Sequence, residues 1–392
     1  MPAGEYAAQY DARRLSAQTP SDTKRGPVDV PFAVLTLLLL AIGVVMVLSA
    51  SYARAYYDLE NETGGNAAYY FIRQGLFALC GVGVMFVCSR LPMSFYRRIS
   101  PVVMLAAGAF LALVLVPGIG TKANGARRWI NLGITTFQPS EIAKIGVVLY
   151  FSDLICRRRD RMNTIRGLWP FAAILGALAL LLVLEPHFSA TIIILAIGIV
   201  MLFIGGARLS LFLIGGGVGA GILLLAYRFV DYVRKRVSSW LDPFADKAGD
   251  GWQIVQSLYS IGSGGLLGLG LGNSRQKYLY LPEEHNDFIF SVVCEELGYI
   301  GAVLILVLFA LLIVRGYWLS MHARDRYSFL AGMGLTTLLA LQVILNVAVC
   351  TNTVPCTGIS LPFFSYGGTA LLLQMAEMGI ILSLSRDIPE KK

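Results

Sequence analysis

Four titratable side chains stand within five consecutive positions, directly before a long apolar run. They are Glu283, Glu284, His285 and Asp287. A carboxylate at the start of a helix is stabilised by the helix dipole and by free backbone amides, so Asp287 is compatible with an ordinary cap. The alternative is a general base, because a partly desolvated carboxylate at a membrane surface can hold a pKa suited to deprotonating a hydroxyl. The residues alone leave both interpretations of Asp287 open.

Further charged residues fall inside apolar runs, where an uncompensated charge is expensive. Glu295 and Glu296 follow two turns after the start of the same run, so they are candidates for a functional role. Glu141 and Lys144 lie three positions apart at the start of another run, so they share one helix face and can neutralise each other. Such a pair either serves catalysis or is a structural bridge that fixes helix packing, and the sequence leaves both open.

Basic residues are frequent in two connections between apolar runs. Residues 120–139 carry Lys122, Arg127 and Arg128 beside Trp129, and the long connection 230–286 carries a basic cluster near its start and Arg275 near its end. These charges are either solvated or form a basic surface for an anionic lipid headgroup.

The long connection 230–286 has a pattern of its own. Apolar residues from Trp252 to Ile261 recur at helical spacing, which predicts an amphipathic helix lying on the membrane surface. Glycines between Gly262 and Gly272 follow it, and they either leave the backbone free to approach a ligand or form a flexible or re-entrant loop.

A short turn at Glu185 and His187 separates two apolar runs. It is predicted on the same side as Asp287, so Glu185 is either a second carboxylate in one cavity or a solvated turn residue. The chain holds only three histidines, which excludes a zinc site built from several of them. A hard divalent cation held by carboxylates, Mg or Mn, stays compatible with the sequence, and no metal ligand is assigned.

A helix break is predicted near the last apolar run. Pro355 and Pro362 precede Ser365 and Tyr366, and two adjacent glycines follow. A break at membrane depth is tolerated only where the backbone is buried or lines a cavity, so this segment is expected to belong to a site.

Membrane-spanning helices have to position these residues. The chain of 392 residues is 56% hydrophobic and 14% charged, and its mean hydropathy is +0.67, which argues against a soluble globular enzyme. We predict an all-α polytopic membrane protein of about ten transmembrane helices, with a large extracytoplasmic loop at 230–286 between helices 7 and 8. The apolar segments are 31–53, 69–89, 101–119, 140–156, 168–184, 187–205, 209–229, 287–314, 327–350 and 364–385.

The distribution of charge predicts the orientation. The N-terminal tail, the even-numbered connections and the C-terminus hold most of the 32 Lys and Arg residues, so both termini are predicted to be cytoplasmic. Residues 1–29 are predicted to be a disordered cytoplasmic tail, 30–386 the membrane domain and 387–392 a cytoplasmic C-terminal tail. The net charge of +8 lies in short clusters rather than on one face, which argues against nucleic acid as a partner.

Several strings together resemble the SEDS family (shape, elongation, division, sporulation), most closely its members FtsW and SpoVE, with RodA as a close relative. The resemblance covers nearly the whole chain after the tail. The strings that carry it are Gly125-Ala126-Arg127-Arg128-Trp129-Ile130, Gln138-Pro139-Ser140-Glu141, Trp252-Gln253, Asp287-Phe288-Ile289-Phe290, Glu295-Glu296-Leu297-Gly298 and Ser365-Tyr366-Gly367-Gly368.

The resemblance implies a peptidoglycan glycosyltransferase in the cytoplasmic membrane of a bacterium, which polymerises lipid II at the outer face for cell division or cell shape. It implies lipid II and undecaprenyl-pyrophosphate-linked glycan as substrates. It also implies a class B penicillin-binding protein that crosslinks the product, and other division or elongation proteins, as partners. Asp287 matches the family's essential outer-loop aspartate, and Glu141 and Lys144 match its Glu and Lys of the fourth span.

This chain departs from the family at two positions. The family often reads His-Thr-Asp where this chain has Asn286 between His285 and Asp287, and Glu-Pro-Asp where it has His187 as the third residue. The first departure leaves the aspartate in place. The second puts in doubt any role for a carboxylate at position 187.

The implied reaction joins the 4-hydroxyl of a lipid II GlcNAc to the anomeric carbon of a donor chain that leaves undecaprenyl pyrophosphate. Asp287 is the expected base, with cationic side chains and a divalent cation as candidates to stabilise the leaving group, and no covalent nucleophile is required, so inversion is expected. The alternatives are a lipid II flippase and a non-enzymatic division scaffold. The residues predicted to bind substrate are Lys122, Arg127, Arg128, Trp129, Trp252, Gln253, Arg275, His285, Ser365 and Tyr366.

Overall fold

Each predicted apolar segment overlaps one long helix in the computed structural model, which describes residues 25–60, 63–123, 126–133, 135–249 and 251–388. These helices are α2 (Val30–Tyr57), α3 (Tyr69–Arg90), α4 (Met93–Val114), α5 (Pro139–Arg157), α6 (Ile165–Leu184), α7 (Phe188–Ile204), α8 (Leu209–Phe229), α11 (Ile289–Met321), α12 (Arg326–Cys350) and α13 (Gly368–Ser385). A short 3-10 turn, Arg159–Arg161, joins α5 to α6.

Seven helices of the described residues are long and apolar enough to cross a membrane, namely α2, α3, α4, α6, α11, α12 and α13. Helix α7 is apolar but has only 17 residues, and α5 carries Glu141, Lys144 and Asp153. The chain is therefore a multi-pass membrane protein, and the count of ten spans stays a prediction.

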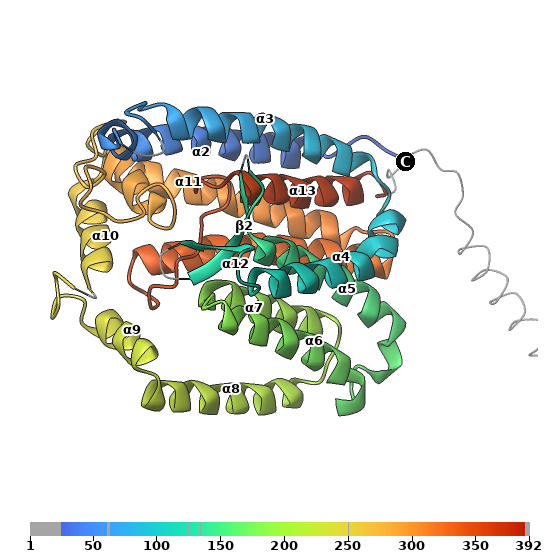
Figure 1. Cartoon of the computed structure of the whole chain (residues 1–392). Coiled ribbons are helices and arrows are strands. Elements are labelled where there is room, and N and C mark those ends of the chain that lie inside the picture. The colour runs from blue at the N-terminus through green and yellow to red at the C-terminus, as the bar shows by residue number, and fades with distance from the viewer. Residues whose placement is uncertain (1–24, 61–62, 124–125, 134, 250, 389–392) are drawn as a thin grey trace, which may run out of the picture.

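The long helices run side by side in one bundle (Figure 1). Helices α2 and α3 form one side, α11, α12, α13 and α5 lie in the middle, and α6, α7 and α8 lie toward the other side. Helices α12 and α13 are the most enclosed of the seven, each with 67% of its most apolar 18 residues buried inside the protein. The core is therefore built around helices from the C-terminal half of the chain.

The predicted outer connection 120–139 holds a small sheet that the sequence prediction did not include. Strands β1 (Gly120–Ala123), β2 (Ala126–Asn131) and β3 (Thr136–Phe137) pair antiparallel in the order β1-β2-β3. Ile130 is opposite Gly120 on one side and Phe137 on the other, and it is buried. The expectation of an all-α fold therefore holds for the bundle and misses this sheet, whose strands are too short and too basic to show an alternating apolar pattern.

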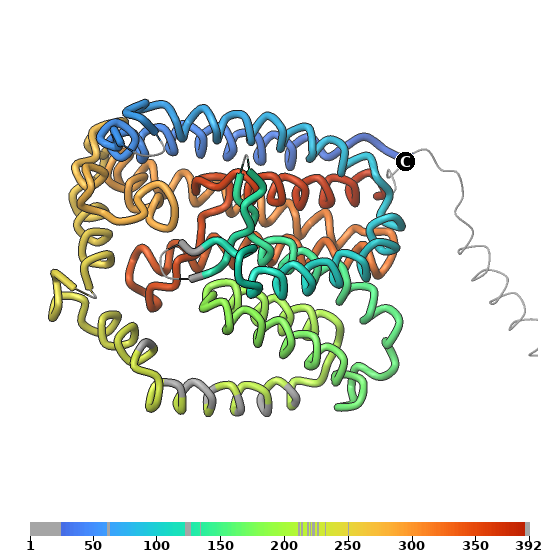
Figure 2. Tube along the Cα trace, viewed as in Figure 1, coloured from blue at the N-terminus to red at the C-terminus, as the bar shows by residue number. Residues whose placement is uncertain are grey.

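The long connection between α8 and α11 stays at one end of the bundle, as the yellow and orange tube shows in Figure 2. It contains α9 (Asp231–Leu241) and α10 (Trp252–Ser263). Helix α10 coincides with the predicted amphipathic helix and buries Ile254, Val255 and Ser257. The connection is thus a folded cap rather than a linker.

Two buried carboxylates attach this cap to α11. Glu296 accepts hydrogen bonds from Ser49 Oγ (2.6 and 2.7 Å to its two oxygens) and forms an ion pair with Lys277 Nζ (3.0 Å). Glu295 accepts from Ser260 Oγ (3.0 Å) and Ser274 Oγ (2.6 Å). Because their partners fix the cap, Glu295 and Glu296 hold the cap on α11, and a functional role for them stays a prediction.

The glycine-rich run approaches a kink in α11. Gly298 has φ +68° and ψ −173°, and a Cβ there would lie 2.2 Å from the backbone N of Gly268. The Gly268 residue in turn has φ +79°. Only glycine allows both the backbone conformation and this close approach, so the run is a packing element that holds the cap on α11.

Both described ends of the chain meet at the other end of the bundle, opposite α9 and α10 in Figure 1. Arg25 forms an ion pair with Asp387 (2.8 Å), and the Gly26 N–H donates to the Arg386 carbonyl (2.9 Å). Residues 25–29 of the predicted tail thus contact the bundle, while residues 1–24 and 389–392 lie outside the described residues. The meeting of the ends requires an even number of crossings, and the cytoplasmic side stays a prediction.

Candidate functional site

Asp287 lies at the capped end of the bundle, two residues before α11. Its backbone carbonyl accepts hydrogen bonds from Asn346 Nδ2 (2.8 Å) and Cys350 Sγ (3.7 Å), which both belong to α12. The next residue, Phe288, is buried and donates its N–H to the carbonyl of Glu283 (3.2 Å). The backbone is therefore fixed from two sides, which sets the position of the carboxylate.

The Asp287 carboxylate accepts no hydrogen bond from the residues that the structure describes, and the residue is partly buried. Burial and the negative charge of Glu283 together raise its pKa to about 6, against the opposing charges of Arg128 and Arg236. Such a carboxylate is ionised at neutral pH, yet basic enough to take a proton. This favours the general-base interpretation over the ordinary cap, whose oxygen would accept from the first backbone amides of the helix.

Gly358 forms the wall beside this carboxylate. It has φ +67°, and a Cβ there would lie 2.9 Å from Asp287 Oδ2 and 3.8 Å from Ser189 Oγ. The Ser189 hydroxyl donates to the carbonyl of Thr357, which ties the start of α7 to the same segment. The predicted helix break at 355–368 therefore does line the site, through a glycine that sequence reasoning did not select.

The predicted residues His285, Ser365 and Tyr366 hold the turn before Asp287. The Tyr366 N–H donates to the His285 carbonyl (2.8 Å), and Ser365 Oγ donates to the Asn286 carbonyl (2.7 Å). The rings of His285 and Tyr366 both pack on Tyr70, each with a centroid distance of 4.9 Å. These contacts give the three residues a positioning role.

Glu284 is the most strongly bonded acid of the titratable cluster. Arg54 Nε and Nη2 donate to its two oxygens at 2.7 and 2.8 Å. Burial opposes the charge of Glu284, but the hydrogen bonds from Arg54 and His285 and their charges outweigh it and lower the pKa to about 2. Glu284 is thus a permanent anion that ties the turn to α2, so it is not the acid that exchanges a proton.

Arg128 is the member of the predicted basic set on β2 that acts on Asp287. It donates to the carbonyl of Pro186 in the turn between α6 and α7. Neighbouring residues of a strand point to opposite faces, so Arg127 and Trp129 lie on the face away from Arg128. The side chain of Lys122 lies outside the described part of the structure.

The turn between α6 and α7 buries Glu185 and His187, so the solvated interpretation of Glu185 is wrong. Both carboxyl oxygens of Glu185 lack a hydrogen-bond partner among the described residues, and burial raises its pKa to about 8 against the charge of Arg128. Burial, Arg128 and Lys144 lower the pKa of His187 to about 3. Both groups are therefore mainly neutral at pH 7, which lets them lie beside Arg128 without adding charge.

Glu141 and Lys144 form the predicted ion pair, with 2.7 Å between Oε2 and Nζ. Lys144 is buried, and the pair lies near another buried acid, Glu377 of α13, which accepts from Gln374 Nε2 (3.1 Å). The charge of Lys144 acts on His187, which lies on the turn that holds Arg128. No described contact joins the pair to Asp287, so its catalytic role stays a prediction.

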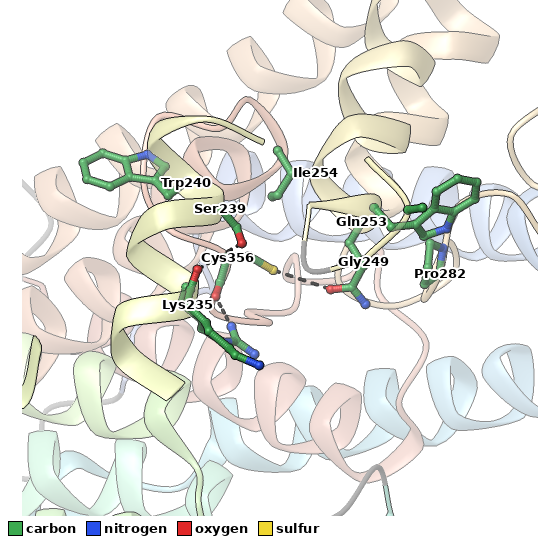
Figure 3. Close-up of a pocket in the computed structure, with 11 residues that line it drawn as sticks. Lys235, Ser239, Trp240, Gly249, Gln253, Ile254, Pro282 and Cys356 are labelled. Carbon is green, nitrogen blue, oxygen red and sulfur yellow. Dashed lines mark hydrogen bonds between the residues drawn. The ribbon is translucent and has the colours of Figure 1, made fainter. Parts of the chain in front are cut away.

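Trp252 and Gln253 line a cavity of about 470 Å³ between α9, α10 and the segment around Cys356. Figure 3 shows Gln253 of α10 facing Cys356, with Lys235, Ser239 and Trp240 of α9 on the other side. Arg275, in contrast, is exposed, and its backbone N–H donates to Glu295 (3.0 Å). The residues predicted to bind substrate therefore do not form one site. Some lie at the Asp287 turn, some line this cavity, and others have no described contact with either.

The described side chains are the possible protein ligands of a metal ion. No group of three or more His, Cys, Asp or Glu side chains gathers among them in a way that could hold a metal ion. The side chains that the structure describes therefore do not form a metal site by themselves, and the expected Mg or Mn stays a prediction.

Three contributors to the site were missed at the sequence level. Arg236 appeared only as part of a basic cluster, although its spacing to Trp240 on an amphipathic α9 could have marked it. Glu377 could have been found as a lone acid in an apolar run. Gly358 carried no signal, because its role comes from a contact with Asp287 across 71 positions of sequence.

Comparisons with known proteins agree with this fold over almost its whole length. The stage V sporulation protein E of Bacillus subtilis is 38% identical over 365 residues, covering 93% of this chain and 98% of that protein. A probable peptidoglycan glycosyltransferase FtsW of Hahella chejuensis is also 38% identical, covering 95% and 94%.

Solved structures are also similar to this chain over almost its whole length. A chain of a structure described as "Structural coordination of polymerization and crosslinking by a peptidoglycan synthase complex" has a TM-score of 0.76 and 29% identity, and the match covers 93% of this chain and 99% of that one. The rod shape determining protein RodA of Thermus thermophilus has a TM-score of 0.65 and 27% identity, with coverage of 93% and 98%. The family model of cell cycle proteins named for FtsW, RodA and SpoVE matches residues 30–389. The chain belongs to the FtsW/RodA/SpoVE family.

Proposed function

We propose that this chain is a peptidoglycan glycosyltransferase that polymerises lipid II at the outer face of the cytoplasmic membrane, for cell division or cell shape. The names of its relatives support the reaction class, since FtsW relatives are named peptidoglycan glycosyltransferases. The observation that carries the proposal is the Asp287 carboxylate, which is partly desolvated, has a pKa of about 6 and feels the charges of Arg128 and Arg236.

Asp287 acts as the general base. It takes the proton of the 4-hydroxyl of the acceptor GlcNAc as that oxygen bonds to the anomeric carbon of the donor, and the bond from this carbon to the pyrophosphate oxygen breaks. No other nucleophile is required, so one displacement converts an α-linked donor into a β-linked product. Gly358 leaves the space that the acceptor hydroxyl needs beside Oδ2.

Positive charge is needed where the leaving pyrophosphate gains negative charge. Arg128 and Arg236 are the cations whose charges act on Asp287, so they are the candidates closest to the reacting atoms. Glu185 and His187 line the same region in neutral form, so they leave the charge of Arg128 available to the substrate. A divalent cation, Mg or Mn, would bind the pyrophosphate itself and add to this charge.

A class B penicillin-binding protein is the proposed partner, which would crosslink the strands that this chain makes. The similarity to a chain of a peptidoglycan synthase complex supports an assembly of this kind. The cap formed by residues 230–286 lies at the same end of the bundle as Asp287, so such a partner would reach the site from that end (Figure 1).

The test is polymerisation of purified lipid II by the purified full chain together with its class B partner, with products separated by size. We expect glycan strands, and we expect a chelator to reduce their amount and Mg or Mn to restore it. Folded protein that makes no polymer with its partner, but moves lipid II between the leaflets of a vesicle, would contradict the proposal and favour the flippase alternative.

A further inference from the structure

The cavity between α9 and α10 has the composition of a site for an anionic saccharide. Its lining includes the cations Lys235 and Arg236, the aromatic side chains Trp240 and Trp252, and the amide of Gln253, and none of the described residues that line it carries a carboxylate. Indole rings stack on the apolar faces of sugars, and Lys and Arg bind phosphate. The volume of about 470 Å³ lies within the range of sites that take small organic ligands.

The cavity is a built feature, because hydrogen bonds hold its walls together. Trp240 Nε1 donates to the Asn352 carbonyl, and Asn352 Nδ2 donates back to the Trp240 carbonyl, both at 3.1 Å. Arg236 donates to the Cys356 carbonyl, and Cys356 Sγ lies 3.8 Å from Gln253 Oε1 (Figure 3). Helices α9 and α10 are thus joined through the segment around Cys356.

The same segment connects the cavity to the candidate base. Gly358, two residues after Cys356, is the wall against Asp287 Oδ2, and Arg236 is near enough for its charge to act on the Asp287 carboxylate. An anionic group bound at Arg236 therefore lies near Asp287, within the range over which the charge of Arg236 acts on that carboxylate.

The chemistry of the proposed reaction indicates whether the pyrophosphate near Arg236 belongs to the donor or to the acceptor. In the donor, the pyrophosphate is bonded to the anomeric carbon that reacts. In the acceptor, the reacting 4-hydroxyl and the pyrophosphate lie at opposite ends of a disaccharide. With the acceptor hydroxyl at Asp287, the pyrophosphate that lies near Arg236 is the one on the donor.

We propose, on the basis of the proposed function, that this cavity is the donor site, in which Lys235 and Arg236 bind the prenyl-linked pyrophosphate and Trp252 contacts the attached sugar. The cavity then selects the donor by its charge and holds the leaving group beside Asp287. The negative charge that forms on the pyrophosphate as its bond to the anomeric carbon breaks stays paired with the two cations.

The first test measures binding of farnesyl pyrophosphate to the purified full chain by microscale thermophoresis, without any turnover. We expect Lys235→Gln with Arg236→Gln to weaken binding at least about tenfold, because two charge-assisted contacts to phosphate are lost. Arg236→Lys, which keeps the charge, should restore part of the affinity. Lys247→Gln is the matched control, because Lys247 is an exposed cation of the same connection that stacks on Phe244 and does not line the cavity.

Equal affinity of the wild type and the double variant would overturn the proposal, and so would absence of binding by the wild type. If the double variant does not fold, Lys235→Gln alone gives the same comparison, since no described contact of its side chain holds the fold. Binding that depends on both cations in a chain that makes no polymer would contradict the proposed function and leave the pyrophosphate site standing.

The second test separates donor from acceptor. Labelled lipid II with a 4-deoxy GlcNAc acts only as a donor, and a GlcNAc-MurNAc disaccharide without the pyrophosphate acts only as an acceptor, so their coupling gives one KM for each substrate. We expect Lys235→Gln with Arg236→Gln to raise the donor KM at least about tenfold and to change the acceptor KM less than about twofold. A rise confined to the acceptor KM would overturn the donor assignment.

Discussion

At the level of single residues, the proposed catalysis depends on the ionisation of Asp287. Burial and Glu283 hold its pKa near 6, while Arg128 and Arg236 oppose them. The base acts only when it is deprotonated. We therefore expect kcat/KM for polymerisation to be constant above about pH 7 and to fall about tenfold per pH unit below the pKa, in a pH profile of the purified chain.

Variants of the charged neighbours of Asp287 test the direction in which each charge shifts its pKa. Glu283→Gln removes a negative charge, so ionisation of Asp287 becomes easier. The acidic limb of the pH profile, where kcat/KM falls, should then move to lower pH. Arg236→Gln removes a positive charge and should move the limb to higher pH. Shifts in the same direction for both variants would show that another group controls the profile.

Gly358 gives a second prediction at this scale. Gly358→Ala adds a methyl group 2.9 Å from Asp287 Oδ2 at a φ of +67°, so it displaces either the carboxylate or the segment 355–362. We expect activity to fall at least about tenfold in the polymerisation assay. The control is Gly262→Ala in α10, where the added methyl group meets no atom within 4 Å, and equal activities of the two variants would contradict this role of Gly358.

At the element scale, α5 contributes a buried ion pair to the packing of α13 and of the turn between α6 and α7. Lys144→Met leaves Glu141 and Glu377 without their cation, so we expect a loss of stability of about 3 kcal/mol or more, read as a lower Tm in detergent. Adding Glu141→Gln should recover most of the Tm.

The double variant also tests the predicted catalytic role of this pair. We expect activity to stay at least about tenfold low after the Tm has recovered, because Glu141 and Lys144 match the Glu and Lys of the family's fourth span, which the resemblance gives a catalytic role. Full activity would show that Glu141 and Lys144 only fix helix packing.

The elements differ in how well the sequence predicts them. Apolar length alone places the long helices, because crossing a bilayer requires about 20 apolar residues in a row. Helix α10 was also predicted, since its apolar spacing is local. The sheet of β1, β2 and β3 was not, because its pairing depends on partners outside each short strand. For the same reason Asp287 was found from its own cluster, whereas Arg236 and Gly358 become part of the site only through tertiary contacts.

At the scale of the whole molecule, the two described ends of the chain meet opposite the cap. The contacts of Arg25 with Asp387 and of Gly26 with Arg386 place them together, and the distribution of Lys and Arg predicts that this end is cytoplasmic. We expect a fluorescent protein fused to the C-terminus to fold and fluoresce, and alkaline phosphatase fused there to be inactive. Active phosphatase would place the Asp287 end in the cytoplasm, where the proposed reaction has no role.

The central claim is that Asp287 is the general base of a lipid II polymerase. The most direct measurement is the rate of lipid II polymerisation by purified Asp287→Asn, which keeps the shape of the side chain, beside the wild type and Asp231→Asn. Asp231 is an exposed acid of the same connection, so its variant controls for a general loss of negative charge. We expect Asp287→Asn to lower the polymerisation rate at least about a hundredfold with an unchanged Tm, and the control to keep the wild-type rate. A folded Asp287→Asn protein that polymerises within a few-fold of the wild-type rate would contradict the general-base role of Asp287.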